Sequence, residues 1–164
     1  MHIYRDHGEA EDSWTIAADP AEPCPAWSVL PLAAWRDRSA PAGPSRYGLL
    51  VRPDDEPAEL RAAAERCPLI VIELAAADGR GYSAARVLRA AGYRGDLRAW
   101  GAFGRDQVLF LARCGFTSFA LHAGLTAQDV KRALQEISAP YQPGLDARTP
   151  IPMLRRARDA QSGS

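Results

Sequence analysis

The sequence predicts a single α/β domain, built on a mainly parallel sheet of about four to five strands flanked by helices. Its 164 residues suit one domain with one core. A hydrophobic share of 47% is enough for that core and excludes wholesale disorder. From Tyr47 onward, short apolar runs alternate with amphipathic stretches, and the connections between them are short. This alternation is typical of parallel strands joined by right-handed helical crossovers.

The regularity of this pattern divides the chain into three parts. Residues 1–46 are expected to be an irregular lead-in that packs on the domain, because prolines punctuate it. Within it, residues 14–16 are expected to form a short strand and residues 32–36 a brief helix. Residues 47–139 are the predicted α/β core, and residues 140–164 are expected to be a flexible C-terminal tail.

Four strands of the core are predicted from apolar runs, at residues 47–51, 69–74, 97–100 and 117–121. The second run, LIVIEL, is apolar on both faces except at Glu73, as in a central strand of a helix-covered parallel sheet. Helices are predicted at residues 57–66, 81–91, 105–114 and 126–137. Their ends carry the usual signals, since Pro57 and Thr126 suit a first turn and Gly115 suits a helix stop.

Charge and hydropathy exclude two classes of partner. The formal net charge is zero, with 20 basic and 20 acidic residues, so the chain lacks the positive surface of a general nucleic-acid binder. No apolar run approaches the roughly 20 residues that cross a bilayer, and the polar N-terminus lacks the apolar stretch of a secretory signal. We therefore expect a cytoplasmic protein without nucleic-acid or membrane partners.

The cysteines and histidines do not predict a metal centre. Cys24, Cys67 and Cys114 are far apart and odd in number, which suits neither a disulfide framework nor an iron–sulfur cluster. The three histidines are scattered too, so no metal-ligand spacing is present. Cys114 lies at a predicted helix C-terminus, where the helix dipole raises a thiol pKa, and is interpreted as a packed, inert residue. A cofactor, if one is bound, stays unknown.

Two loops are the candidates for chemistry, because ligands bind outside the carboxyl ends of parallel strands. The first loop is Asp78-Gly79-Arg80-Gly81, and the second runs from Gly101 to Gln107. Both should lie at one edge of the sheet, on adjacent strands. Asp78 is the candidate acid or base, and arginines would clamp an anion at a helix N-terminus. The candidate ligand-binding residues are Gly79, Arg80, Gly81, Ser83, Arg98, Arg105, Asp106 and Gln107.

Ordinary turn chemistry is the competing interpretation of these loops. Asp-Gly pairs are common in turns, and Asp78 would then orient the turn or cap the helix. The glycine spacing matches neither the dinucleotide fingerprint nor the phosphate-binding P-loop. Spacing alone favours the turn interpretation.

The two helices that follow these loops have faces of different character. In the first helix, Tyr82, Arg86 and Arg89 lie opposite the core-facing stripe and are interpreted as a solvated or partner-binding surface. In the second helix, Phe110 and Cys114 lie away from the main core face. Their apolar character predicts burial by the lead-in or by a second subunit.

The stretch from Asp78 to Phe116 also carries a distinctive series of short motifs. The series runs DGRGYS at residues 78–83, then Ala85-Arg86, Leu88-Arg89, Gly92-Tyr93, Gly95, Leu97-Arg98-Ala99, Asp106-Gln107 and Arg113-Cys114-Gly115-Phe116. It resembles a family of bacterial domains of unknown function, numbered 934. Members of this family are commonly encoded beside assimilatory sulfite reductase and are often labelled oxidoreductases. The resemblance implies a link to sulfur assimilation and supplies no reaction.

The chain departs from the family pattern at two positions. Where the family has Gly-Asp-Val in the second loop, this chain has Gly101-Ala102-Phe103, so an expected carboxylate is missing. An aromatic residue usually precedes the Asp-Gly-Arg-Gly string, and this chain has three alanines there. If the family uses an acid in the second loop, Ala102 would impair this member or change its ligand.

Three functional hypotheses follow, and whether the chain is an enzyme stays open. The first is an accessory protein of sulfite reduction that binds the reductase or a small anion. The second is an enzyme acting on a small anionic metabolite, with the Asp78/Arg80 and Arg105/Gln107 loops as its active site. The third is a homodimeric interaction domain that buries Phe110 and Cys114 between subunits.

Overall fold

The structure is a computed structural model that describes residues 1–17, 26–36, 47–65, 67–76 and 78–136. The expected tail, residues 140–164, lies outside these residues. Eight strands are present in the described part of the chain: β1 (His2–Arg5), β2 (Gly8–Glu11), β3 (Thr15–Ile16), β4 (Ser28–Pro31), β5 (Tyr47–Val51), β6 (Leu69–Leu74), β7 (Asp96–Gly101) and β8 (Ser118–Ala120).

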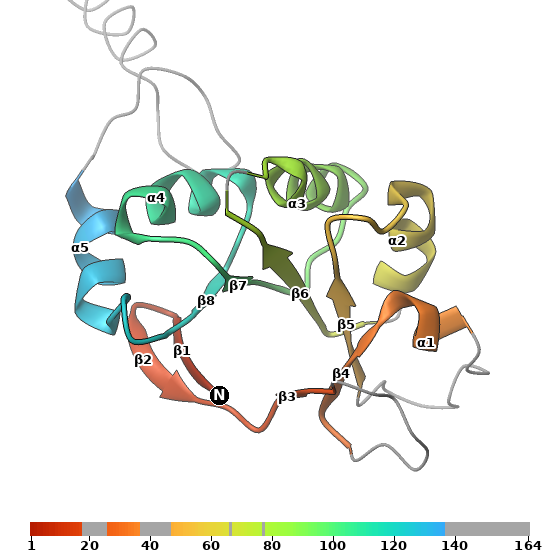
Figure 1. Ribbon diagram of the computed structural model, residues 1–164, viewed down its shortest axis with the longest axis horizontal. Coiled ribbons are helices and arrows are strands. Elements are labelled where there is room, and N and C mark those ends of the chain that lie inside the picture. Colours follow the sequence, from red (N-terminus) through yellow and green to blue (C-terminus); the bar gives the residue numbers. More distant parts are fainter. Residues whose placement is uncertain (18–25, 37–46, 66, 77, 137–164) are drawn as a thin grey trace, which may run out of the picture.

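All eight strands belong to one mixed sheet with the order β2-β1-β8-β7-β6-β5-β4-β3. The strands from β3 to β8 pair in parallel, whereas β1 pairs antiparallel with both β2 and β8. The sheet is strongly curled, so that its two edges approach each other (Figure 1). Residues 12–14 join β2 at one edge to β3 at the other.

The α/β class is confirmed, but the expected sheet was wrong in size and in direction. Four strands of the core were anticipated, and the first 31 residues add four more. Of these, the short strand β3 alone had been expected. The β1–β2 hairpin turns at Asp6 and His7, both with positive φ (52° and 68°), without the Asn-Gly signal that would announce it. Strand β4 lies among prolines, which favoured an irregular interpretation.

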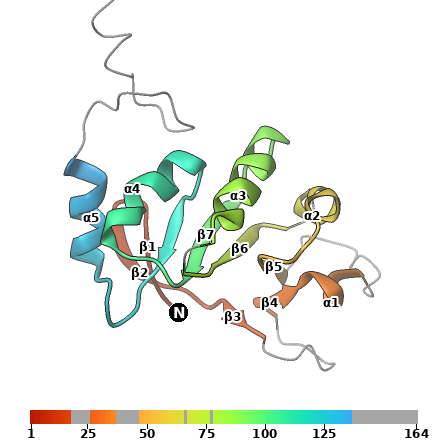
Figure 2. The same ribbon diagram turned by 45° about the horizontal axis from the view of Figure 1, so that its top comes forward.

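Five helices follow the parallel strands within the described residues: α1 (Leu32–Arg36), α2 (Pro57–Ala64), α3 (Arg80–Ala90), α4 (Arg105–Cys114) and α5 (Ala127–Glu136). Each parallel strand from β4 to β8 lies beside the one before it in the chain, so each crossover steps in the same direction. Right-handed crossovers then place every helix on the same face. Figures 1 and 2 show the helices along the convex side of the curl.

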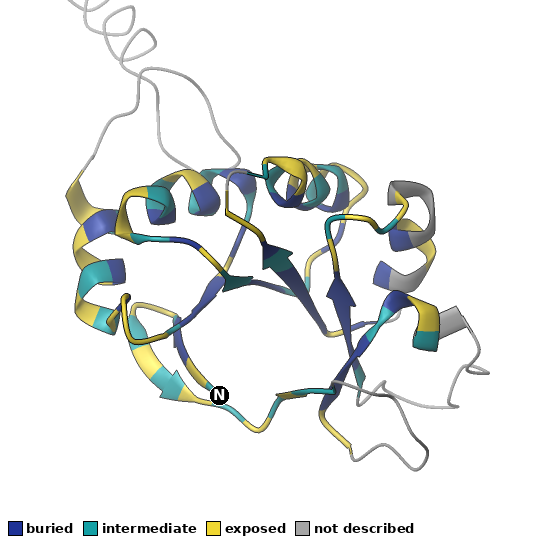
Figure 3. Ribbon diagram, in the orientation of Figure 1, coloured by how far each residue is buried: buried dark blue, intermediate teal, exposed yellow. Residues whose placement is uncertain are grey.

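Two apolar clusters lie on the two faces of the sheet, and Figure 3 shows most of β5 and β6 as buried. The larger cluster lies between the sheet and the helices and includes Ile70 and Ile72 of β6. The smaller one lies on the concave face and includes Leu69 and Val71 of the same strand, with Trp100 packed against it. Strand β6 is therefore buried on both sides, as its apolar run predicts, but helices cover one side alone.

Candidate functional site

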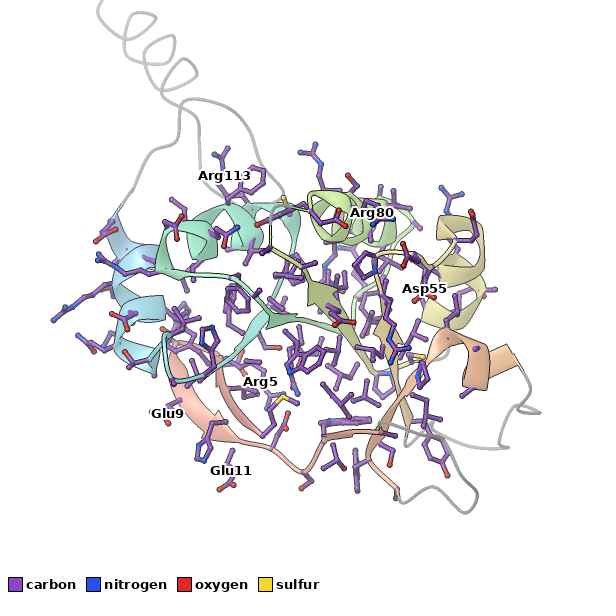
Figure 4. The ribbon with its side chains drawn as sticks, in the orientation of Figure 1. Arg5, Glu9, Glu11, Asp55, Arg80 and Arg113 are labelled. Atoms are coloured by element: carbon purple, nitrogen blue, oxygen red, sulfur yellow. The ribbon has the colours of Figure 1, made fainter. Side chains whose placement is uncertain are left out.

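A cleft of about 330 Å³ opens at the carboxyl edge of the sheet, where the loop after β5 and the start of α3 face each other. Its apolar floor consists of Val51, Leu60, Ile72, Ala84 and Val87. Its polar lining consists of Arg52, Asp54, Asp55, Glu56, Glu73, Arg80 and Ser83. Figure 4 labels Arg80 on α3 and Asp55 in the loop after β5, and both residues line this cleft.

Arg80 is the centre of the charged network beside this cleft. Its Nε donates to both carboxylate oxygens of Asp78 (3.2 and 3.0 Å), and its Nη2 donates to Oδ2 of Asp78 at 2.8 Å. Its Nη1 donates to Oδ1 of Asp54 at 2.8 Å. These bonds raise the pKa of Arg80. Arg80 therefore bridges the loop after β5 to the loop after β6.

Asp78 is held in its ionised form by this arrangement. Besides the side-chain bonds, its Oδ1 accepts a hydrogen bond of 2.9 Å from the backbone N–H of Arg80, an Asx-type turn around Gly79, the N-cap of α3. The Arg80 side chain and backbone together lower the pKa of the Asp78 carboxyl. A carboxyl with a lowered pKa is ionised at neutral pH, where it has no proton to donate and is a weak base, so this geometry supports a turn contact and charge pairing rather than acid–base chemistry.

Arg52 and Glu73 form the second polar pair of the cleft. The Arg52 Nε lies 3.7 Å from Oε2 of Glu73, and the Arg52 backbone N–H donates to Oδ2 of Asp55 at 2.7 Å. Glu73 is next to Trp100 in the strand register, at the carboxyl end of the concave face. The sequence interpretation did not include these residues. The signals were present, since Glu73 interrupts an apolar strand and Asp54 belongs to an acidic run directly after another strand.

The second loop lies beside the first, as expected from adjacent strands. Strands β6 and β7 are neighbours, and the backbone N–H of Ala102 donates to the carbonyl of Leu74 at 2.8 Å. Gly101 has φ +105°, and a Cβ atom there would lie 2.6 Å from the Leu74 carbonyl oxygen. A glycine is therefore required at this approach of two backbones.

Gln107 connects the two helices without entering the cleft. Its Oε1 accepts from the backbone N–H of Gly104 at 3.0 Å, and its Nε2 donates to the Tyr82 hydroxyl at 2.8 Å. Burial raises the pKa of Tyr82. The Tyr82 ring also contacts Phe110, with 5.2 Å between the ring centroids.

The other candidate residues lie elsewhere. Arg105 pairs with Glu136 of α5 and, together with Asp106, lines a separate cleft between α4 and α5. Gly79 is exposed within the first loop, and Gly81 packs closely on Leu74 of β6. The structure thus brings Asp78, Arg80, Gly81 and Ser83 to one place and leaves Arg105, Asp106 and Gln107 outside it.

Arg98 was a ligand candidate, but its side chain is fully buried on the concave face. Its Nε donates to Oγ of Ser118 at 3.1 Å, and its Nη2 donates to Oδ2 of Asp96 at 3.0 Å. The same Nη2 lies 2.5 Å from Oδ2 of Asp12. Strand alternation explains the position, because Arg98 points to the face opposite Leu97 and Ala99. Arg98 therefore belongs to the interior and not to the loop edge.

Two expectations about helix surfaces need correction. Arg89 is not a solvated residue, since it donates to the carbonyl oxygens of Gly115, Tyr93 and Gly95 at 2.8–3.0 Å. Cys114 is buried in the core of its own chain, where desolvation raises its thiol pKa. Phe110, in contrast, keeps 53% of its surface exposed in the described structure.

Among the described residues, no three or more His, Cys, Asp or Glu side chains are placed to share a metal ion. None of the described helices combines the length and apolar character of a membrane crossing.

A family model described as "Bacterial protein of unknown function (DUF934)" matches residues 48–152. The protein belongs to this family. The DUF934 match begins in β5 and includes the whole lining of the cleft, together with Tyr82, Gln107 and Phe110. Strands β1 to β4 precede the matched DUF934 region. No curated protein and no solved structure matched the chain.

Proposed function

We propose that this DUF934 protein is an accessory protein of assimilatory sulfite reduction, and that it binds a small ligand with an anionic group in the cleft between α2 and α3. The observation that carries the binding proposal is that Arg52 and Arg80 line the same cleft, above an apolar floor. Small-molecule sites have this character, with a mainly apolar lining and a few convergent polar groups. The link to sulfite reduction rests on the family resemblance.

The partners of the two arginines leave room for a ligand anion. Asp54, which contacts Nη1 of Arg80, has a side chain that is 89% exposed, so breaking this solvent-screened ion pair costs little free energy. Arg52 and Glu73 are 3.7 Å apart, beyond hydrogen-bond distance. An anionic group can therefore replace Asp54 on Arg80 while Asp78 keeps the guanidinium in place.

Catalysis on a small anionic metabolite is the less supported alternative. Its acid–base candidate, Asp78, has a lowered pKa and is held by Arg80. Arg105 and Gln107, the other half of that active site, point to other partners. The carboxylate that the resemblance places in the second loop is replaced by Ala102. Binding of a ligand at the cleft is therefore better supported than its chemical conversion there.

A thermal-shift panel of sulfite, sulfate, phosphate and sulfur-containing metabolites tests the binding proposal. We expect at least one compound to raise the melting temperature of the wild type and of Arg86→Ala, an exposed arginine on the same helix. Arg80→Ala should lose this shift. Equal shifts in Arg80→Ala, or no shift with any compound, would refute binding at this cleft.

The link to sulfite reduction has its own test. A pull-down with the chain as bait should recover sulfite reductase, and a deletion strain should grow poorly on sulfite as sulfur source. If the pull-down is empty and growth is normal, the accessory role falls while the cleft can still bind a ligand.

A homodimeric interface is a second candidate function, favoured by the exposed ring of Phe110 beside Tyr82. Large exposed aromatic side chains are enriched at protein interfaces. Light scattering at micromolar concentration should then give the mass of a dimer, and Phe110→Ser should give a monomer. A wild-type monomer would count against this candidate.

A further inference from the structure

The charges around the cleft do not suit a ligand that is purely anionic. Four carboxylates (Asp54, Asp55, Glu56 and Glu73) line it against two guanidiniums, those of Arg52 and Arg80. The carboxylate of Asp78 adds a further negative charge on Arg80. An inorganic anion would therefore enter a region with an excess of negative charge, which opposes its binding.

Arg80 offers one edge for a ligand. Asp78 occupies its Nε and Nη2, and these bonds also fix the start of α3. Nη1 is held by the exposed carboxylate of Asp54, so this edge can exchange partners. A ligand anion bound there would leave Asp54 beside it, without the cation that it now contacts.

The displaced carboxylate would itself need a positive partner. Glu56 is exposed in the same lining, so a second acidic residue belongs to the cleft beside Asp54. A ligand that carries an ammonium close to its anionic group supplies this charge, and it leaves the total charge of the cleft unchanged. Ala84 and Val87, both partly exposed, provide an apolar surface for a short side chain above the buried Leu60 and Ile72.

We propose that the cleft binds a zwitterion of the amino-acid class, with its carboxylate on Nη1 of Arg80 and its ammonium between Asp54 and Glu56. This inference rests on the proposed function and narrows its ligand from small anions to aminocarboxylates. A cleft of about 330 Å³ is at the small end of ligand sites, which suits a molecule of this size.

Matched sets of compounds test the two charges separately. Each set contains an amino acid such as L-serine or L-cysteine, its N-acetyl derivative without the ammonium, and its amide without the carboxylate. Sulfate and sulfite serve as anions without a positive group. By isothermal titration calorimetry, the amino acid should bind at least roughly tenfold more tightly than either derivative.

Two variants assign the charges to residues. Arg80→Ala should abolish binding of the amino acid, whereas Asp54→Asn should reduce the preference over the N-acetyl derivative to less than about threefold. Glu9→Gln, which changes an exposed carboxylate on β2 far from the cleft, should leave both affinities unchanged. The melting temperature of each variant without ligand checks that the fold is kept.

The outcomes separate this inference from the proposed function. If sulfite, sulfate or the N-acetyl derivative binds as tightly as the amino acid, and binding depends on Arg80, the cleft is an anion site. The proposal that its ligand is a zwitterion is then wrong. An amino acid preference that persists in Asp54→Asn also overturns the inference. If no compound binds, the zwitterion and the binding of any small anion at this cleft both fall, while the link to sulfite reduction keeps its own test.

Discussion

The guanidinium Nη2 of Arg98 lies 2.5 Å from the carboxylate of Asp12 inside the curl of the sheet. Arg98 is fully buried on β7, and Asp12 belongs to the segment that joins the two edges of the sheet. The Asp12 side chain is 12% exposed, and its Oδ1 also accepts from the backbone N–H of Trp14. This ion pair therefore connects the segment between β2 and β3 to β7, in the middle of the sheet.

Replacing Asp12 with asparagine should lower the free energy of unfolding by about 1.5–3 kcal/mol, because the buried guanidinium of Arg98 keeps Asp96 but loses the other of its two carboxylate partners. Urea denaturation at pH 7 measures the loss. Asp6→Asn is the matched control, since the Asp6 side chain is 90% exposed, and it should change stability by less than about 0.5 kcal/mol. Similar small losses in both variants would show that the buried pair contributes little.

Arg89→Met should destabilise the protein by about 2–4 kcal/mol, because three carbonyl oxygens at the ends of α3 and α4 lose a charged donor. Methionine keeps much of the apolar stem, so the loss reports on the hydrogen bonds. The control is Arg86→Met on the same helix, whose side chain is exposed. Equal unfolding free energies for the two variants, measured in urea, would contradict the role assigned to Arg89.

Gly101→Ala should cost about 3 kcal/mol, because it combines a positive φ with a contact of 2.6 Å to the Leu74 carbonyl oxygen. Gly79→Ala is the comparison. Gly79 has φ −82°, and a Cβ there would meet nothing within 4 Å. Its replacement should be neutral or stabilise by up to about 1 kcal/mol. Thermal melts of the two variants check this difference, and a comparable loss at Gly79 would contradict it.

The stability contributed by Asp129 should depend on pH. Its Oδ2 accepts from the hydroxyl (2.6 Å) and the backbone N–H (3.1 Å) of Thr126 at the start of α5. These bonds lower the pKa of Asp129 in the folded protein. A depressed folded pKa gives stability that is present above the unfolded pKa of about 4 and is lost as the pH falls through the folded value.

Asp129→Asn should therefore be less stable than the wild type at pH 7, and the difference should shrink as the pH falls below about 4. Urea midpoints from pH 7 to pH 2.5 measure it. A deficit that stays constant over this range would mean that the charge of Asp129 is not responsible.

Cys114 should be unreactive in the folded protein, because burial raises its thiol pKa and blocks access. Cys67 is buried as well. In a Cys24→Ser variant, Ellman's reagent at pH 8 should label neither remaining thiol before urea unfolds the protein. Rapid labelling of one thiol under native conditions would contradict this expectation.

The periodicity of the sequence predicted those strands and helices whose own residues carry a clear apolar pattern. The apolar runs that became β5 to β8 and the amphipathic stretches between them are local signals, and all of these elements are present. The formation of strands β1 and β4 depends instead on pairing with other strands of the sheet. Strand β1 has four residues and is ordered by pairing with β8, which lies near the other end of the described chain. Such a strand has little local signature, so propensity could not find it.

The sequence predicted the edge of the sheet at which the candidate site lies, but not the residues that contact one another there. Loop composition located Asp78 and Arg80, but it could not show that Arg80 also contacts Asp54 of the neighbouring loop. The register of β7 sends Arg98 inward. Successive side chains of a strand point to opposite faces of the sheet, so a shift of one residue decides whether a side chain lies in the interior or on the surface. The composition of a segment does not show this.

The pairing of Ile3 with Ala120 has a consequence for the order of events during synthesis. The ribosome releases β1 first, yet its partner β8 emerges only after β4 to β7 and their helices. Until then the nascent sheet has an unpaired edge, and the first strand has no place to dock. A contact of such long sequence separation is slow to form. Closure of the curl is therefore a late step of folding, and pausing of translation before residue 118 should leave the N-terminal hairpin accessible to chaperones and proteases.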